Sequence, residues 1–186
     1  TDTMQRKITI YPEVTADFSI TVPEDTLGCS PLPVDFVDNS NNEVAYSWRF
    51  GDGVSDFSQN PSHTFTNIKG QDTVYTTRLV ARSDYFCRDT AYMVFTVHPY
   101  IENGFTIDKH EGCSPLDVTF TNGSVYADTI FFDYGDGADT VMTSYNTIIH
   151  RYTNTSTTVD TNVVEMIVKN DEGCYVYAYD TVIVYP

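Results

Sequence analysis

The sequence predicts an all-β protein built from two successive β-sandwiches, and three observations support this prediction. First, a long segment occurs twice along the chain. Second, apolar and polar residues alternate along several short runs, as they do in strands that turn one face to a core. Third, the 186 residues include 14 Tyr and 11 Phe, together with many Thr and Val, and these residue types favour strands.

The repeat defines the predicted domains. The matched features are Gly28-Cys29-Ser30-Pro31-Leu32 with Gly112-Cys113-Ser114-Pro115-Leu116, Phe50-Gly51-Asp52-Gly53 with Tyr134-Gly135-Asp136-Gly137, and Cys87 with Cys174. A repeat unit as long as residues 13–99 is a whole domain, because solenoid repeats run to only about 20–50 residues. We therefore expect one domain over residues 13–99 and a second over residues 100–186.

The N-terminal residues 1–12 resemble the end of a further copy. Residues 2–12 align with residues 89–99, so they are expected to be the last strand of a preceding truncated repeat, or a linker. The chain begins without Met and shows neither a signal peptide nor an apolar run long enough to span a bilayer. The sequence is therefore interpreted as a fragment of a longer array.

The composition bears on the class of partner. The chain has 26 acidic and 10 basic residues, for a formal net charge of −16. The basic residues are spread along the sequence without forming a basic stripe, so a phosphate backbone would be repelled. We expect no nucleic-acid partner and no direct insertion into a membrane. The hydrophobic content of 41% is that of a folded protein.

Each copy carries two cysteines at matching positions, and we predict the disulfides Cys29–Cys87 and Cys113–Cys174. Each bridge would close a long loop, and the chain-entropy model predicts that this stabilises the folded state by about 4 kcal/mol. Free buried thiols and a zinc site are the alternatives, although the spacing is not Cys-x-x-Cys and no histidine lies beside the pairs. The disulfides would indicate an exported protein, either extracellular or on the cell surface.

Five runs of alternating residues in the first copy are predicted strands. They cover residues 16–22, 32–37, 46–50, 73–82 and 90–97.

The third of these runs leads into a turn. Tyr46, Trp48 and Phe50 share one face of the run, and Trp48 is expected in the core. Gly51-Asp52-Gly53 then forms a tight turn that needs positive φ, in which Asp52 accepts hydrogen bonds from its own loop. Short strands separated by turns, with a Trp on the third strand, describe an immunoglobulin-like β-sandwich.

These motifs resemble the signature of polycystic kidney disease (PKD) domains. The first copy carries Ser47-Trp48-Arg49-Phe50-Gly51-Asp52-Gly53 and His63-Thr64-Phe65, and the second carries Phe132-Asp133-Tyr134-Gly135-Asp136-Gly137 and His150-Arg151-Tyr152. The cysteine-bearing segments are similar to those of tandem PKD domains in surface and secreted proteins of Bacteroidetes. The resemblance implies extracellular sandwiches of about seven strands each. It also implies that they space, rigidify or bind protein or carbohydrate, without catalytic activity.

The glycine-flanked aspartates and the histidines are the most chemically suggestive side chains. Asp52 and Asp136 are expected to hold their own turns, because calcium needs about six to eight oxygen ligands and each loop offers few. Calcium is the alternative, and no other cofactor is expected. His63 and His150 are expected to bond backbone carbonyls and to pack on aromatic rings. No nucleophile elbow or zinc-protease motif accompanies them, so no catalytic residue is expected.

Two further patterns are compatible with binding or modification. Tyr175, Tyr177 and Tyr179 share one face of a predicted strand, where cross-strand packing is the expected role and ligand contact the alternative. An Asp-Thr-apolar pattern resembles the O-glycosylation acceptor of exported Bacteroidetes proteins, at Thr26, Thr73, Thr90, Thr129, Thr140 and Thr181. The same pattern arises wherever Asp ends a turn and Thr begins a strand.

The sequence therefore predicts a non-enzymatic fragment of a larger surface or secreted protein, acting as a spacer and interaction module. Repeats that end in Pro12, Pro99 and Pro186 leave only short linkers, which restrict the angle between neighbours. The expected partners are neighbouring domains of the same polypeptide. The alternative is an adhesion module that binds carbohydrate or protein through tyrosine-rich faces or tip loops.

Overall fold

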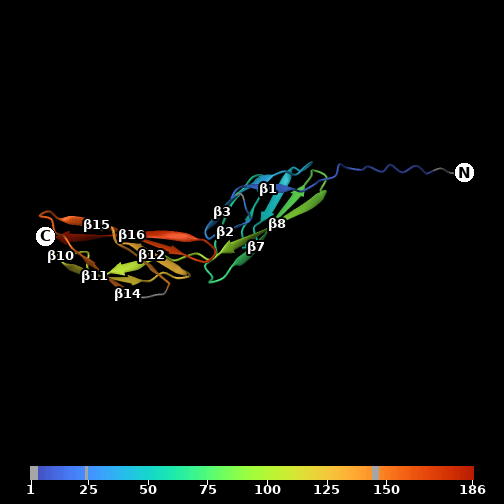
Figure 1. Ribbon diagram of the computed structural model, residues 1–186. Coiled ribbons are helices and arrows are strands. Elements are labelled where there is room, and N and C mark those ends of the chain that lie inside the picture. The colour runs from blue at the N-terminus through green and yellow to red at the C-terminus, as the bar shows by residue number, and fades with distance from the viewer. Residues whose placement is uncertain (1–3, 24, 144–146) are drawn as a thin grey trace. The chain divides into compact units, whose positions relative to one another are not determined.

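The computed structural model describes residues 4–23, 25–143 and 147–186, and all sixteen regular elements in this part of the chain are β-strands. The chain divides into two compact units, Thr1–His98 and Pro99–Pro186. Figure 1 draws the first unit in blue to green and the second in yellow-green to red. The predicted all-β class with two sandwiches is confirmed. Among the described residues, no helix is long and apolar enough to cross a bilayer.

The first unit is a sandwich of two sheets. One sheet has the order β1-β3-β6 and the other the order β2-β8-β7-β4-β5. The strands are β1 (Phe18–Val22), β2 (Leu27–Cys29), β3 (Leu32–Asp38), β4 (Ala45–Arg49), β5 (Ser55–Asp56), β6 (Ser62–Phe65), β7 (Thr73–Arg82) and β8 (Arg88–His98). Neighbouring strands are antiparallel except for β2, which lies parallel to the end of β8. The predicted run 73–82 coincides with β7, and the other four runs overlap β1, β3, β4 and β8.

Aromatic side chains fill the space between these two sheets. Trp48 is fully buried, and its ring lies 5.0 Å from that of Phe18 and 5.4 Å from that of Phe36. Its indole Nε1 donates a hydrogen bond to the backbone oxygen of Ser58 at 2.9 Å. The only polar atom of the Trp48 side chain is therefore satisfied, as a buried indole requires.

The second unit repeats this arrangement strand for strand. Its sheets have the orders β9-β11-β14 and β10-β16-β15-β12-β13. The strands are β9 (Phe105–Ile107), β10 (Glu111–Cys113), β11 (Leu116–Asn122), β12 (Thr129–Asp133), β13 (Asp139–Met142), β14 (Thr147–Tyr152), β15 (Asp160–Lys169) and β16 (Tyr175–Tyr185). Phe132 is fully buried at the position that corresponds to Trp48 and packs against Phe105 and Phe120.

Residues 4–12 form no strand. A strand needs a hydrogen-bonded neighbour, and the described part of this segment has none. The remaining residues of the predicted strand, up to Thr3, lie outside the described residues. Tyr11 contributes one packing contact, because its ring stacks on that of Tyr85 at 4.0 Å.

The chain enters and leaves each unit at opposite ends of its longest strand. In the first unit, the backbone NH of Ala16 donates to the Asp89 carboxylate at 2.8 Å, beside the start of β8, and the chain leaves at His98, where β8 ends. In the second unit, Val125 NH donates to the backbone oxygen of Glu102 at 2.9 Å, and the nearby Asp128 NH donates to that of Lys169 at 2.9 Å. Lys169 is paired with Tyr175 at the start of β16, and β16 ends at Tyr185. A strand of 11 residues spans roughly 35 Å at about 3.4 Å per residue.

Candidate functional site

The glycine-flanked aspartate of each unit holds the turn in which it lies. Asp52 Oδ1 accepts a hydrogen bond from Val54 NH, and Asp136 Oδ1 accepts one from Ala138 NH, both at 3.0 Å. Gly51 has φ +95°, and a Cβ on it would lie 2.8 Å from the backbone nitrogen and oxygen of Thr76. The turn is therefore pressed against β7, and only glycine fits there.

The second oxygen of each aspartate binds a histidine from the opposite sheet. Asp52 Oδ2 lies 2.7 Å from His63 Nε2, and Asp136 Oδ2 lies 2.7 Å from His150 Nε2. The expectation that these histidines bond backbone carbonyls is wrong. The His63 ring stacks on Phe50 at 4.1 Å, and this stacking points its Nε2 at the turn that follows Phe50.

This arrangement connects the two sheets. The histidine belongs to the three-stranded sheet, whereas the aspartate follows a strand of the five-stranded sheet. Burial raises the pKa of the neighbouring Tyr152, whose hydroxyl donates to the backbone oxygen of Tyr134 at 3.0 Å. Among the described residues, no serine hydroxyl bonds either histidine. The geometry therefore suits a structural clamp and lacks the activated nucleophile of acyl-transfer chemistry.

The predicted disulfides Cys29–Cys87 and Cys113–Cys174 are wrong. Cys87 and Cys113 are free thiols, and Cys29 and Cys174 are disulfide-bonded. Cys29 lies opposite His98 at the end of β8, whereas Cys87 directly precedes the start of β8. The length of β8 keeps these two cysteines roughly 35 Å apart, and a disulfide joins Cα atoms less than about 7 Å apart.

The second unit separates its cysteines in the same way. Cys113 lies opposite Tyr185 at the end of β16, and Cys174 directly precedes the start of that strand. Each unit therefore has one cysteine at the end where the chain enters and one at the end where it leaves.

Tyr175, Tyr177 and Tyr179 form an exposed row, called here the tyrosine strip, on the outer face of β16. Their side chains are 58%, 50% and 62% exposed. Adjacent rings lie 5.6 Å and 6.5 Å apart, the first pair edge-to-face and the second nearly parallel. The hydroxyl of Tyr179 donates to the Glu165 carboxylate at 2.6 Å, and this bond raises the pKa of Tyr179. The strip is therefore ordered and open to solvent, although cross-strand packing was the expected role.

The candidate threonines lie at or beside strands and none of them is fully buried. Thr129 is exposed, and the other five are half-buried: Thr26, Thr73, Thr90, Thr140 and Thr181. Their modification stays a prediction.

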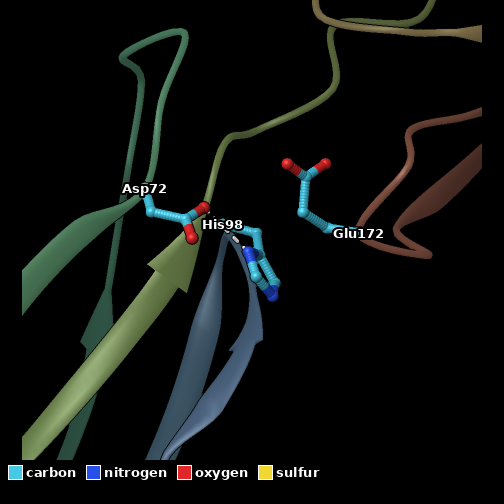
Figure 2. A group of neighbouring side chains, drawn as sticks. All are labelled: Asp72, His98 and Glu172. Carbon is cyan, nitrogen blue, oxygen red and sulfur yellow. Dashed lines mark hydrogen bonds and ion pairs between the residues drawn. The ribbon is translucent and has the colours of Figure 1, made fainter.

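The structure also brings together residues that the sequence did not single out. His98 Nδ1 lies 2.8 Å from Asp72 Oδ1, which joins the end of β8 to the residue before β7 (Figure 2). Tyr185 has the corresponding place at the end of β16, and its hydroxyl donates to Glu111 at 2.8 Å.

A buried asparagine in each unit was likewise missed. The side-chain nitrogen of Asn67 donates to the backbone oxygens of Gln71 and Val97, and that of Asn154 donates to Thr158 and Val184. The sequence signal was a Thr-Asn pair that follows the His-x-aromatic motif in both copies. Each asparagine thus ties the loop that follows it to the last strand of its unit, β8 or β16.

Residues 20–97, which lie in the first unit, match the family model of the PKD domain. The second unit has the same strand order and the same Asp–His clamp. No curated protein matches the chain.

Among solved structures, the PKD1 domain of the metalloprotease PrtV from Vibrio cholerae is 23% identical, with a TM-score of 0.38, and the match covers 47% of this chain and 99% of that domain. The PKD1 domain of Vibrio anguillarum Epp is 22% identical, with a TM-score of 0.37, covering 47% of this chain and 96% of that one. The fibronectin(III)-like modules of Clostridium thermocellum CbhA are 13% identical, with a TM-score of 0.39, covering 91% and 93%.

Proposed function

We propose that the two units are non-catalytic spacer modules of a larger exported protein, and that their main partners are neighbouring domains of the same polypeptide. The observation that carries the proposal is the path of the chain. In each unit the chain enters beside the start of the longest strand and leaves at its end. Each module therefore advances the polypeptide by roughly 35 Å.

The residues that the two copies share support the same function. The Asp–His clamp, the turn glycines and the core aromatic residues all hold the sandwich together. None of them is arranged as a reactive group at the surface. Disulfide-bonded cysteines favour an oxidising compartment outside the cytosol. A module whose repeated residues stabilise the fold is suited to maintaining a distance under load.

Single-molecule force spectroscopy on the whole chain tests this proposal. The chain is pulled from both ends in the presence of a reductant, so that disulfides do not shorten the extension. A spacer gives two separate unfolding events, each releasing on the order of 300 Å at about 3.6 Å per residue. A chain that extends smoothly without resolved events would contradict the proposal.

The tyrosine strip favours a second candidate function, the binding of a neutral glycan. Three exposed, ordered aromatic rings in a row can stack on the apolar faces of sugar rings. Calorimetric titration with a neutral β-glucan oligosaccharide tests it, using Tyr177→Ala as the disrupting variant. Ile149→Ala is the control, because Ile149 is 68% exposed on β14, in the other sheet of this unit. Unchanged affinity in Tyr177→Ala, or no binding at all, would reject this function.

A further inference from the structure

The outer face of the five-stranded sheet in the first unit gathers most of the arginines of the protein. Four of the six arginines in the chain belong to strands β4, β7 and β8: Arg49, Arg78, Arg82 and Arg88. On β7 the intervening Leu79 and Ala81 are fully buried, so the arginines point away from the core. A chain with a net charge of −16 thus carries one local basic face, which the spread of these residues along the sequence concealed.

The arginines on this face stand opposite one another in pairs. Arg49 on β4 is the direct neighbour of Arg78 on β7, and Arg82 on β7 is the direct neighbour of Arg88 on β8. Like charges in direct cross-strand positions destabilise a sheet. The pairs therefore have an energetic cost that nothing in the fold of this unit requires.

None of these arginines forms an ion pair with another described residue. The ion pairs in this part of the chain involve the four histidines and Arg151, and none involves an arginine of this face. Arg78 Nε is buried and has no hydrogen-bond acceptor among the described residues. A buried guanidinium donor without an acceptor is costly, and a carboxylate or sulfate oxygen is its best partner.

Three of the four arginines line a surface groove with a volume of about 420 Å³. Arg78, Arg82 and Arg88 contribute to its wall, together with the 73% exposed ring of Phe57. The guanidinium of Arg82 also lies 5.4 Å from the ring centre of Phe86, which helps to hold it in place. The groove thus combines positive charge with an aromatic wall.

The second unit does not have this feature. The positions that correspond to Arg49 and Arg78 are Asp133 and Glu165, and these two residues are again direct cross-strand neighbours. At these two positions the sheet carries acidic side chains in place of basic ones, and the pair Arg82–Arg88 is replaced by Lys169–Tyr175. The basic groove is therefore not a requirement of the fold but a property of the first unit.

We propose that this groove binds an anionic oligosaccharide, one whose sugar rings carry carboxylate or sulfate groups. This site goes beyond the spacer function and is separate from the tyrosine strip of the second unit. Arg78 and Arg82 are four positions apart on β7, about 14 Å along the strand. The ligand therefore spans more than one sugar ring and presents at least two charged groups. Its carboxylate or sulfate oxygens accept from the guanidinium groups, and a ring face packs on Phe57.

The position of the groove favours a saccharide over an acidic peptide. Extended peptides commonly bind sheets by adding a strand to a free edge, where their main chain gains hydrogen bonds. The groove lies over β7, which is already paired with β4 on one side and with β8 on the other. A ligand on this face can use only its substituents and its ring faces, as a charged sugar does.

Calorimetric titration of the whole chain with short oligogalacturonides and with dextran sulfate tests the proposal, with neutral dextran as the uncharged control. We expect at least one of the charged saccharides to bind, with an affinity that falls as salt rises, and neutral dextran not to bind. Binding of the oligogalacturonides alone would assign carboxylate groups, and binding of dextran sulfate alone would assign sulfate groups. Failure of both to bind at millimolar concentration would overturn the proposal.

Matched variants locate the site. Arg78→Gln and Arg82→Gln should each weaken binding at least tenfold. Arg82→Lys retains the charge but cannot form bidentate hydrogen bonds, so it should cause an intermediate loss of affinity. Arg6→Gln removes the same charge from the exposed N-terminal segment and should change affinity less than twofold. Trp48 fluorescence verifies that each variant is folded. Equal losses in Arg6→Gln and Arg78→Gln would overturn the site, and tighter binding of poly-L-glutamate than of either charged saccharide would overturn the ligand class.

Discussion

Replacement of Gly51 by alanine tests how the turn packs against its neighbouring strand. Two costs add in Gly51→Ala. A side chain at φ +95° is strained by about 1–2 kcal/mol. The new Cβ would also lie 2.8 Å from the backbone nitrogen and oxygen of Thr76. The backbone of β7 is paired on both sides and cannot retreat freely, so overpacking adds about 1–3 kcal/mol.

Gly53 provides the matched control. It has φ +99° in the same turn, but a Cβ on it meets nothing within 4 Å. Gly53→Ala should therefore show only the conformational strain, about 1–2 kcal/mol. The difference between the two variants in the free energy of unfolding therefore measures the cost of the contact with the Thr76 backbone alone.

The assay is urea unfolding followed by tryptophan fluorescence. Trp48 is the only Trp in the chain and is fully buried in the first unit, so its emission reports the unfolding of that unit. We expect Gly51→Ala to lower the free energy of unfolding by about 1–3 kcal/mol more than Gly53→Ala does. Equal losses in the two variants would refute the argument that the turn is pressed against β7.

Three further predictions follow from the contacts described above. Without reductant, a maleimide should label Cys87 and Cys113 only, since Cys29 and Cys174 are disulfide-bonded; labelling of all four cysteines would contradict this. EDTA should leave the Trp48 unfolding midpoint unchanged, because both oxygens of Asp52 are bonded within the protein, and a fall of several degrees would reveal a calcium ion. Hydrogen bonds lower the pKa values of Asp56, Asp89, Asp108 and Asp117. The folded state thus favours their charged forms, so the stabilisation is present above about pH 4 and is lost as the pH falls further. A melting temperature that stays constant or rises between about pH 4 and pH 2 would contradict this last prediction.

The sequence was sufficient for the fold because local patterns and packing agree. Alternation along residues 73–82 predicted a strand, and β7 has those bounds, with Leu79 and Ala81 buried and Arg78 and Arg82 facing outward. The repeat then supplied the second sandwich without further argument. The predicted strand at the N-terminus was wrong for residues 4–12. These residues resemble β8 in sequence, but they have no neighbouring strand with which to pair.

The contacts between distant residues were harder to predict, because they depend on strand direction. The cysteines were paired within each copy because each copy carries two of them at matching positions, which does not reveal whether they lie at the same end of the sandwich. Because β2 pairs in parallel with the end of β8, Cys29 lies at the opposite end of the unit from Cys87. No local sequence pattern reveals this pairing. Strand pairing likewise brings Arg49 beside Arg78 and Arg82 beside Arg88, which spacing along the chain could not show.

The claim that the chain passes from one end of each unit to the other is tested most directly by a distance between two cysteines of the first unit. Spin labels on Cys29 and Cys87, in a chain carrying Cys113→Ser and Cys174→Ser, report this distance by pulsed electron paramagnetic resonance. Cys29 lies opposite the last residue of β8 and Cys87 precedes its first, so we predict a separation of roughly 35 Å. A separation below about 10 Å would place both cysteines at one end, as a disulfide within the unit requires, and would contradict the spacer function.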